Sequence, residues 1–200
     1  MSSSIDKATR RILEAALTLF ARHGFQRTSM ADVAVEAKIS RATLYNRFND
    51  KRALFETIAS TLVTDALAAA EGAWVEGATF AANLEASLIA KDLPLYRILQ
   101  ASPHGAELLA LDPALTKDHA RRLDEAFAAL LSRRAARAEA SGADLDAFGG
   151  LEGFGRFLAI TGAGLKHETR SEAEYRAAVH RLCLITARAS APNCNQRDLP

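Results

Sequence analysis

Apolar side chains recur three and four residues apart along most of this chain, which is the spacing of one face of an α-helix. The first such face lies in residues 7–23, and Gly24 is a natural stop for that helix. Its members are Ile12, Leu13, Ala16, Leu17 and Phe20. No segment alternates apolar and polar residues between turn signals, as a half-buried strand would. The pattern therefore predicts an all-α protein.

Three helix-capping residues follow close together after Gly24. Ser29 has Asp32 three residues later, a pattern close to the capping box. Ser40 can cap a helix over residues 41–48, and Asp50 can cap the next helix. Two short helices joined by a tight turn predict a helix-turn-helix, whose second helix enters the major groove of DNA.

Helical geometry divides residues 41–48 into a buried face and an outward face. Leu44 and Phe48 lie four residues apart and are predicted to anchor this helix to its core. Arg41 projects from the first turn toward a guanine edge or a phosphate, whereas Asn46 points nearly opposite the anchors and suits adenine. The predicted base-contacting residues are Arg41, Ala42, Thr43 and Asn46.

The charge distribution supports a phosphate-facing head. Residues 1–56 hold ten basic and six acidic side chains, a net charge of +4, while the whole chain carries +1. The Tyr45 hydroxyl, the Lys51 ammonium and the backbone N–H groups of the helix that starts at Lys51 suit phosphate oxygens. Arg47 lies nearer the core side of its helix, so we expect it to contact the DNA backbone or another part of the head.

The run from Arg11 to Phe55 resembles the N-terminal domain of the tetracycline-repressor (TetR-like) family of bacterial transcription regulators. The matching segments include Thr28-Ser29-Met30-x-Asp32-Val33-Ala34, Ser40-Arg41-Ala42-Thr43-Leu44-Tyr45-x-x-Phe48 and Asp50-Lys51-x-x-Leu54. The resemblance implies operator binding by the Ser40–Phe48 helix, and it adds Thr28 and Ser29 to the residues that touch the DNA backbone. Asn46 departs from the aromatic or basic residue that is frequent at its position, so no operator sequence carries over.

The resemblance also implies a homodimer with two domains in each chain. Residues 1–50 would form the helix-turn-helix domain, and residues 51–200 a helical effector-binding and dimerisation domain, with 191–200 as a frayed tail. Within this second domain, Asp92 is predicted to cap a new helix with Pro94 in its first turn, after a helix over 80–90. Further helices are predicted over 104–111, from Pro113 to about Ala140, from Asp144 or Asp146, and from Ser171.

An effector pocket between helices would be mostly apolar with a few polar anchors. Each of its aromatic candidates is more often a plain core residue than a pocket residue, and His104 and Tyr96 are the candidate polar anchors. The candidates are Trp74, Phe80, Tyr96, His104, Phe127, Phe154 and Phe157.

The last two helices are predicted to build the dimer interface as a four-helix bundle across a two-fold axis, as the resemblance implies. The predicted interface residues are Gly153, Phe154, Phe157, Tyr175, Val179, Leu182, Cys183 and Thr186. The glycines of residues 149–155 fit either a close helix approach at this interface or a looser, bent segment.

Catalytic, metal and membrane functions find no support in the sequence. The five histidines lack metal-ligand spacing, no serine lies in a Gly-x-Ser-x-Gly elbow, and Cys183 and Cys194 form no disulfide framework. No enzyme activity, cofactor or metal is therefore predicted. No apolar run is predicted to span a membrane and no secretory signal is evident, so a reducing cytoplasm is the expected location.

These observations predict a homodimeric repressor that binds double-stranded operator DNA and is released by an unknown small apolar or amphipathic effector. Two alternatives stay open. One is a DNA-binding regulator without a small-molecule effector. The other is an all-α small-molecule-binding protein or enzyme with a vestigial helix-turn-helix. Salt-sensitive binding to duplex DNA would separate the last alternative from the others.

Overall fold

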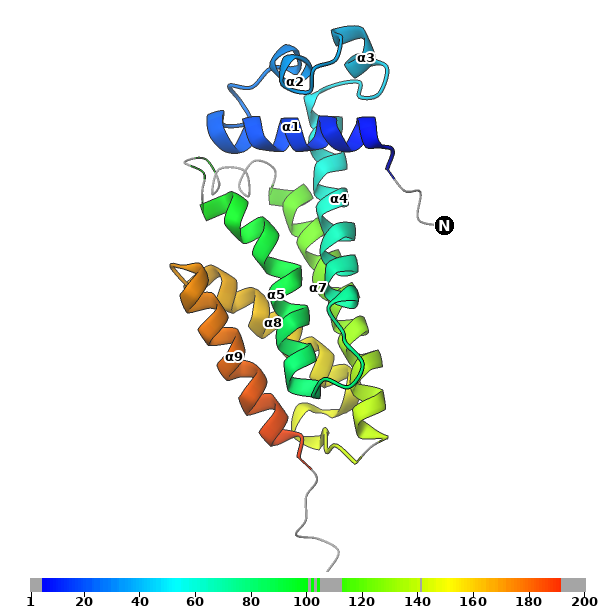
Figure 1. The fold of residues 1–200 in the computed structure, drawn as a ribbon, viewed down its shortest axis with the longest axis vertical. Helices are drawn as coiled ribbons and strands as arrows, with labels where there is room; N and C mark the ends of the chain where they lie inside the picture. The colour runs from blue at the N-terminus through cyan, green and yellow to red at the C-terminus, as the bar shows by residue number, and fades with distance from the viewer. Residues whose placement is uncertain (1–4, 101, 103, 105–112, 141, 192–200) are drawn as a thin grey trace, which may run out of the picture. The chain divides into compact units, whose positions relative to one another are not determined.

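The computed structural model describes residues 5–100, 102, 104, 113–140 and 142–191 (Figure 1). Within these residues the secondary structure is helical and contains no strand, as predicted. The predicted helix over 104–111 lies outside the described residues apart from His104, as does most of the predicted tail. The helices are α1 (Lys7–His23), α2 (Met30–Glu36), α3 (Arg41–Tyr45), α4 (Lys51–Gly72), α5 (Phe80–Gln100), α7 (Pro113–Glu139), α8 (Gly150–Glu168) and α9 (Glu172–Ala189), with a 3-10 turn η1 (Asp146–Phe148).

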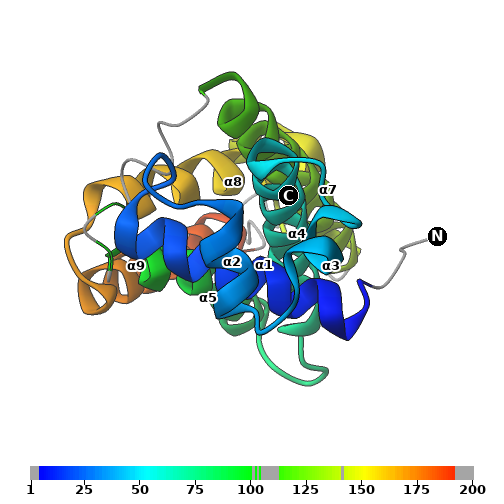
Figure 2. The ribbon, with the colours of Figure 1, turned by 90° about the horizontal axis from the view of Figure 1, so that it is seen from above.

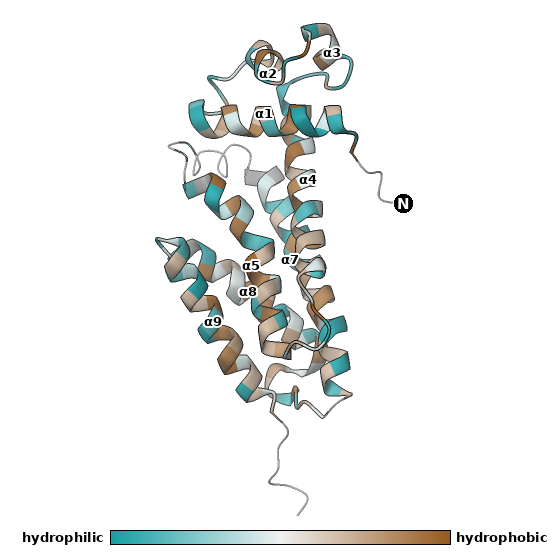
Figure 3. Ribbon diagram, viewed as in Figure 1, coloured by the Kyte–Doolittle hydropathy of each residue, from teal (hydrophilic) through white to brown (hydrophobic). Residues whose placement is uncertain are grey.

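The chain forms two compact units, each with its own apolar core. The first unit comprises residues 1–64 and 97–120, and the second comprises residues 65–96 and 121–200. Apolar and polar residues are mixed along every long helix in Figure 3, as expected of amphipathic helices that each bury one face.

The first unit is built on α1, with α2 and α3 together on one side of it (Figure 1, Figure 2). Asp6 caps α1 by accepting hydrogen bonds from the backbone N–H groups of Ala8 and Thr9, both at 2.9 Å. Gly24 ends α1 at φ 83°, a backbone conformation that favours glycine, and its N–H donates to the Phe20 carbonyl. The predicted bounds of this helix are therefore confirmed.

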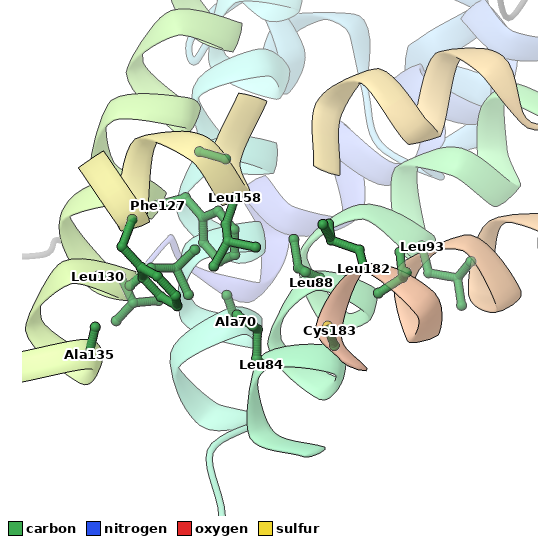
Figure 4. Close-up of a cluster of buried hydrophobic side chains, with 14 of the residues drawn as sticks. Ala70, Leu84, Leu88, Leu93, Phe127, Leu130, Ala135, Leu158, Leu182 and Cys183 are labelled. Atoms are coloured by element: carbon green, nitrogen blue, oxygen red, sulfur yellow. The ribbon is translucent and has the colours of Figure 1, made fainter. Parts of the chain in front are cut away.

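The second unit packs α5, α7, α8 and α9 around a core of leucine and aromatic side chains (Figure 4). Large side chains from all four helices are fully buried there, which is the main source of stability for a helical unit of this kind. They include Leu84, Leu88, Phe127, Leu131, Phe154, Leu158 and Tyr175.

Helix α5 runs without interruption from Phe80 to Gln100, so the predicted helix start at Asp92 is wrong. Pro94 lies inside the helix and has no N–H to donate to the Ala90 carbonyl four residues earlier. The local cost is outweighed by burial, because Leu93 and Tyr96 on the same turns are core residues. Asp92 is itself buried and takes part in a tertiary network instead of a helix cap.

Helix α8 begins at Gly150, later than predicted, because η1 occupies residues 146–148. Asp144 accepts a hydrogen bond from the Asp146 N–H at 2.9 Å, so it forms an Asx turn before η1 and does not cap α8. Gly149 and Gly150 both have φ 78°, a conformation that L-residues with a side chain rarely adopt. The two glycines thus reverse the chain between η1 and α8.

Gly155 allows a close approach of α8 to α7 within the second unit. A Cβ atom at Gly155 would clash with the Ala128 carbonyl oxygen and the Ser132 hydroxyl. The Ser132 hydroxyl also donates to the Leu151 carbonyl at 2.9 Å, which links the two helices. Both alternatives for this glycine cluster are therefore observed: Gly149 and Gly150 form a bend, and Gly155 allows a close approach to a helix of the same chain.

Helix α4 is long and apolar enough to cross a membrane by length and composition alone, which contradicts the prediction that no segment reaches this length. Leu54 and Ile58 in α4 are buried in the first core, and Ala70 is buried in the second. Helix α4 therefore contributes to both cores, although only 22% of its apolar window is buried.

Candidate nucleic-acid interface

Helix α2 begins with a complete capping box. The Ser29 hydroxyl accepts a hydrogen bond from the Asp32 N–H at 3.2 Å, and the Asp32 carboxylate accepts one from the Ser29 N–H at 2.8 Å. The hydrogen bonds from the Ser29 side chain and backbone lower the pKa of Asp32 below its usual value. The charged carboxylate therefore fixes the position at which the chain enters α2.

The turn between α2 and α3 is a Schellman motif. The N–H of Lys38 donates to the Val35 carbonyl, and the N–H of Ile39 donates to the Ala34 carbonyl, both at 3.0 Å. Lys38 takes the left-handed position of this motif with φ 54°, which glycine normally occupies. The motif sets the angle between the two helices. The residue type of Lys38 does not indicate a left-handed position, so the motif cannot be identified from the sequence.

Helix α3 is capped by Ser40, as predicted, but it ends at Tyr45 instead of Phe48. The Ser40 hydroxyl accepts from the Thr43 N–H at 3.0 Å and shares a second hydrogen bond with the Thr43 hydroxyl at 2.8 Å. The Phe48 N–H still donates to the Leu44 carbonyl, so the helical turn extends beyond the regular helix. With the Thr43 hydroxyl bonded to the cap, its methyl group remains as the group suited to a thymine methyl.

The side chains of α3 divide as the helical wheel predicts. Leu44 and Phe48 are buried in the first core, where they contribute to one apolar cluster with α1 and α2. The remaining residues of the segment are exposed to solvent, including every predicted base-contacting residue. These exposed residues are Arg41, Ala42, Thr43, Tyr45, Asn46 and Arg47.

Lys51 forms contacts within the first unit instead of projecting from it. Its ammonium donates hydrogen bonds to the carbonyls of Phe25 at 2.6 Å, Thr28 at 2.8 Å and Gln26 at 3.3 Å. It also lies 4.4 Å from the centre of the Phe25 ring, and its partial burial lowers its pKa. All three N–H groups are in use, which gives Lys51 a structural role within the head, and its phosphate contact stays a prediction.

Two other predicted phosphate contacts are also engaged inside the first unit. Thr28 is buried, and its hydroxyl donates to the Gly24 carbonyl at 2.9 Å, so its side chain is not available to DNA. The Arg47 guanidinium donates to the Asp6 carboxylate at 2.7 Å and to the Thr9 hydroxyl, which is the intramolecular alternative for Arg47. These contacts tie the end of α3 to the start of α1 and help to lower the pKa of Asp6, after the larger effect of the Thr9 N–H.

A concave surface at the start of α2 adds a basic residue that the sequence did not single out. The surface is lined by Leu19, His23, Arg27, Thr28 and Asp32. Arg27 is exposed and directly precedes the capped start of α2. A guanidinium in this place is suited to a phosphate oxygen next to the exposed Ser29.

The predicted dimer-interface residues of α9 lie in the core of their own unit, and their place at a dimer interface stays a prediction. Tyr175, Val179, Leu182, Cys183 and Thr186 are all buried within the single chain. Burial raises the pKa of the Cys183 thiol to about 12, which makes it an inert core residue. The helical period had located one apolar face of α9 but could not show that this face packs inward.

Residues Gly153 and Phe154 of the predicted interface also pack inside the second unit. Phe154 is buried, and a Cβ atom at Gly153 would clash with the Phe148 carbonyl. Phe157 is the one predicted interface residue that is exposed. Three other large apolar residues of α8 and α9 are exposed as well. These outer-face residues are Phe157, Ile160, Leu184 and Ile185, between 42% and 65% exposed.

The predicted pocket residues form two separate groups and not one site. Trp74, Phe80 and Phe154 form a chain of ring contacts, with centroids 5.6 and 5.9 Å apart. Tyr96 is stacked on Tyr175 at 5.7 Å, and its hydroxyl donates to the Thr169 carbonyl. Of the other candidates, Phe127 is a core residue of the second unit, Phe157 is on its outer face, and His104 belongs to the first unit.

A buried charged network in the second unit was not predicted. Asp92 accepts hydrogen bonds from Lys91 at 2.8 Å, from Lys166 at 3.0 Å and from the Tyr175 hydroxyl at 2.8 Å. Because Asp92 precedes Pro94 by two residues, its sequence context suggested a helix cap and hid this role. The charged residues of α5 follow no pattern in the sequence that would show that Lys91 and Asp92 are buried.

The head has three helices, and its third helix, α3, is capped and exposed. This architecture places the protein in the class of helix-turn-helix proteins. The sequence model described as "Bacterial regulatory proteins, tetR family" matches residues 12–58, which contain this head. Two uncharacterized HTH-type transcriptional regulators of Bacillus subtilis are similar. YfiR is 40% identical over 62 residues, which are 31% of this chain and 30% of YfiR. YhgD is 34% identical over 87 residues, which are 44% of this chain and 45% of YhgD.

Two solved structures share the fold along nearly the whole chain. A transcriptional regulator from Cytophaga hutchinsonii is 18% identical with a TM-score of 0.68, and covers 92% of this chain and 96% of its own. The SmeT–triclosan complex is 18% identical with a TM-score of 0.67, and covers 98% of this chain and 100% of its own. The helix-turn-helix head of this protein, residues 12–58, thus matches the tetR family of bacterial regulatory proteins, and the rest of the chain shares the fold of these solved structures.

Proposed function

We propose that the protein is a sequence-specific DNA-binding transcription regulator in which α3 enters the major groove. The observation that carries this proposal is the division of α3 into a buried face and an exposed face. Leu44 and Phe48 hold the helix to the core, while Arg41, Thr43 and Asn46 remain exposed on a rigid, capped support. Preformed geometry of this kind allows base contacts without the cost of ordering a loop.

The proposed DNA contacts follow from the side chains that the head leaves free for a partner. Arg41 and Asn46 would bond base edges, and Ala42 and the Thr43 methyl would contact thymine. Tyr45 is 51% exposed, and its hydroxyl would bond a phosphate oxygen. Ser29 and Arg27 at the start of α2 would add backbone contacts, since Lys51 and Thr28 are committed within the head.

The matching experiment selects bound oligonucleotides from a random duplex pool with the full-length protein. We expect one enriched operator, with binding that weakens as salt rises by about 0.9 log unit per log unit of salt for each neutralised phosphate. Arg41→Ala should relax the preference at one base position by about 1–3 kcal/mol. Lys117→Ala, on exposed α7 surface, is the control and should select the same operator. Absence of salt-sensitive binding to any duplex would refute the proposed function.

We also propose a homodimer whose interface is the outer face of α8 and α9. Phe157, Ile160, Leu184 and Ile185 form an exposed apolar set on the two helices, and a two-fold axis would pair this set with its own copy. A dimer would place two copies of α3 in successive major grooves, roughly 34–36 Å apart or a multiple of this.

The oligomeric state tests the interface directly. Ile185→Glu should convert the dimer to a monomer in analytical ultracentrifugation, because two buried carboxylates would face each other across the axis. Val75→Glu changes an equally apolar exposed residue outside α8 and α9, and should leave the dimer intact. A dimer that survives Ile185→Glu together with Phe157→Glu would move the interface elsewhere.

We further propose that the second unit binds a small molecule that releases the protein from its operator, as a repressor in the cytoplasm. Support comes from the triclosan complex of the similar SmeT and from α4, a single helix whose residues 51–64 belong to the head and whose residues 65–72 belong to the second unit. The effector must bind the DNA-free conformation more tightly than the DNA-bound one, or DNA affinity would not change.

A further inference from the structure

The network around Asp92 buries two charges almost completely. The side chain of Lys91 has 0% of its surface exposed, and that of Asp92 has 1%. Both lie on α5, and the network reaches α8 through Lys166 and α9 through Tyr175. Removing an ammonium from water is costly unless hydrogen-bond acceptors and opposite charge replace the water.

The acceptors for Lys91 are incomplete. An ammonium group has three N–H donors. Among the described residues, only Asp92 accepts a hydrogen bond from Lys91. The remaining close contact is the face of the Phe127 ring, whose centre lies 4.9 Å from Nζ and offers a weaker, cation–π attraction.

The charge balance of the network is also incomplete. Lys91 and Lys166 both bond the same Oδ1 atom of Asp92, so two ammonium groups share one carboxylate. Burial is the largest effect on Lys91 and lowers its pKa, and the repulsion from Lys166 acts in the same direction. Asp124 on α7 is a further acid that acts on Lys91, but its effect is the smallest of those at this site.

Besides Asp124, aromatic side chains lie against the network. Phe127 lies against Lys91, and the stacked rings of Tyr96 and Tyr175 lie beside Asp92 through the Tyr175 hydroxyl. Lys166 is 19% exposed, so the network reaches solvent at one edge. An anion attached to an apolar body would match these surroundings, because its charge meets the ammonium groups and its body meets the rings.

We infer that Lys91, with Lys166, forms the recognition site for the carboxylate of an aromatic or acyl organic acid, which is the effector of this regulator. The inference rests on the proposed function in assigning the acid a regulatory role, but the binding site itself does not. The carboxylate would accept hydrogen bonds from the unused N–H groups of Lys91 and supply the missing negative charge.

The binding test uses the full-length protein with paired probes that differ only in charge. 1-Naphthoate and decanoate are compared with 1-naphthamide and decanamide, together with a panel of other aromatic and straight-chain acids and their amides. Calorimetry and the fluorescence of Trp74, the single tryptophan, report binding. We expect at least one acid to bind tenfold or more tightly than its amide. Equal affinity for every pair, or no binding of any acid, would overturn the inference.

Two variants assign the effect to Lys91. Lys91→Met keeps a side chain of similar length, leaves Asp92 bonded to Lys166 and Tyr175, and should remove the preference for the acid while leaving amide affinity within about threefold. Lys117→Met removes an exposed lysine of α7 and should keep the preference. Retention of the preference in Lys91→Met would overturn the assignment.

A second readout requires no ligand. A buried ammonium with unused donors is a cost to the fold, so ligand-free Lys91→Met should melt at the same temperature as the unsubstituted protein or above it. A fall of more than about 4 °C would show that Lys91 is structural and would overturn the inference. Operator release is measured separately. Acid binding without release would refute the effector role alone, and absence of DNA binding would refute the proposed function.

Discussion

Lys51 provides the sharpest test of how the DNA-binding head is held together. Its ammonium bonds three backbone carbonyls of the segment between α1 and α2, two of them at 2.6 and 2.8 Å. A hydrogen bond to a charged group contributes about 1.5–3 kcal/mol, but Lys51 is only partly buried, so water would replace much of this after substitution. We therefore expect Lys51→Met to lower the free energy of unfolding by about 2 kcal/mol.

Urea unfolding followed by circular dichroism measures this change. With a slope of about 2 kcal/mol per molar urea, the midpoint should fall by about 1 M. Lys38→Met removes an exposed lysine of the same head and should shift the midpoint by less than about 0.3 M. The dependence of operator binding on salt should keep its slope in Lys51→Met, because this ammonium neutralises no phosphate. An unchanged midpoint combined with a slope reduced by about 0.9 would show that Lys51 binds DNA and refute the structural role.

Other predictions concern backbone geometry and pH. Gly155→Ala should lower the free energy of unfolding by about 1–3 kcal/mol, because its Cβ would clash with α7. Gly164→Ala places its Cβ in open space and should raise the free energy of unfolding by about 0.5–1 kcal/mol. Equal shifts in melting temperature for the two variants would contradict this packing. Lys38→Gly should raise the urea midpoint, because relief of the left-handed strain of about 1–2 kcal/mol exceeds the entropy cost of glycine, and a lower midpoint would contradict the turn geometry. Hydrogen bonds lower the folded-state pKa of Asp6 and Asp32, so their stabilisation is present above the unfolded value of about 3.9 and is lost as pH falls through the lower folded values. The melting temperature should therefore fall less steeply below pH 4 when both are changed to Asn, and identical acid profiles would contradict the expectation.

The head was predictable because its signals are local. The hydrogen bonds of the capping residues Ser29, Ser40 and Asp6 reach only two or three positions along the chain. Sequence order alone therefore identifies Ser29 and Ser40 as caps and locates the helix that follows Asp6. The anchors Leu44 and Phe48 follow from helical period. The tight turn was predicted, but the left-handed backbone of Lys38 was not, because it is imposed by the two flanking helices and not by its own side chain.

The contacts of long basic side chains were less predictable. Lys51 and Arg47 both have residue types and positions suited to phosphate, yet each finds an acceptor in its own head. A lysine ammonium on its flexible stem can reach either a partner or a nearby carbonyl, and sequence spacing does not distinguish these. Asp92 was misassigned for the same reason, since its partners lie 74 and 83 residues away on α8 and α9.

The burial of the predicted interface residues of α9 has a physical cause that also supports the proposed outer-face interface. An amphipathic helix in a dimer has two apolar surfaces, one for its own core and one for the partner, and the core surface is the more apolar and continuous. Tyr175, Val179 and Leu182 belong to the first, so the strongest periodic signal identified the core. Leu184 and Ile185 are exposed between charged residues, and such residues are costly on a monomer that gains nothing from them. Their exposure is therefore better evidence for a partner surface than the stronger apolar stripe that periodicity detects.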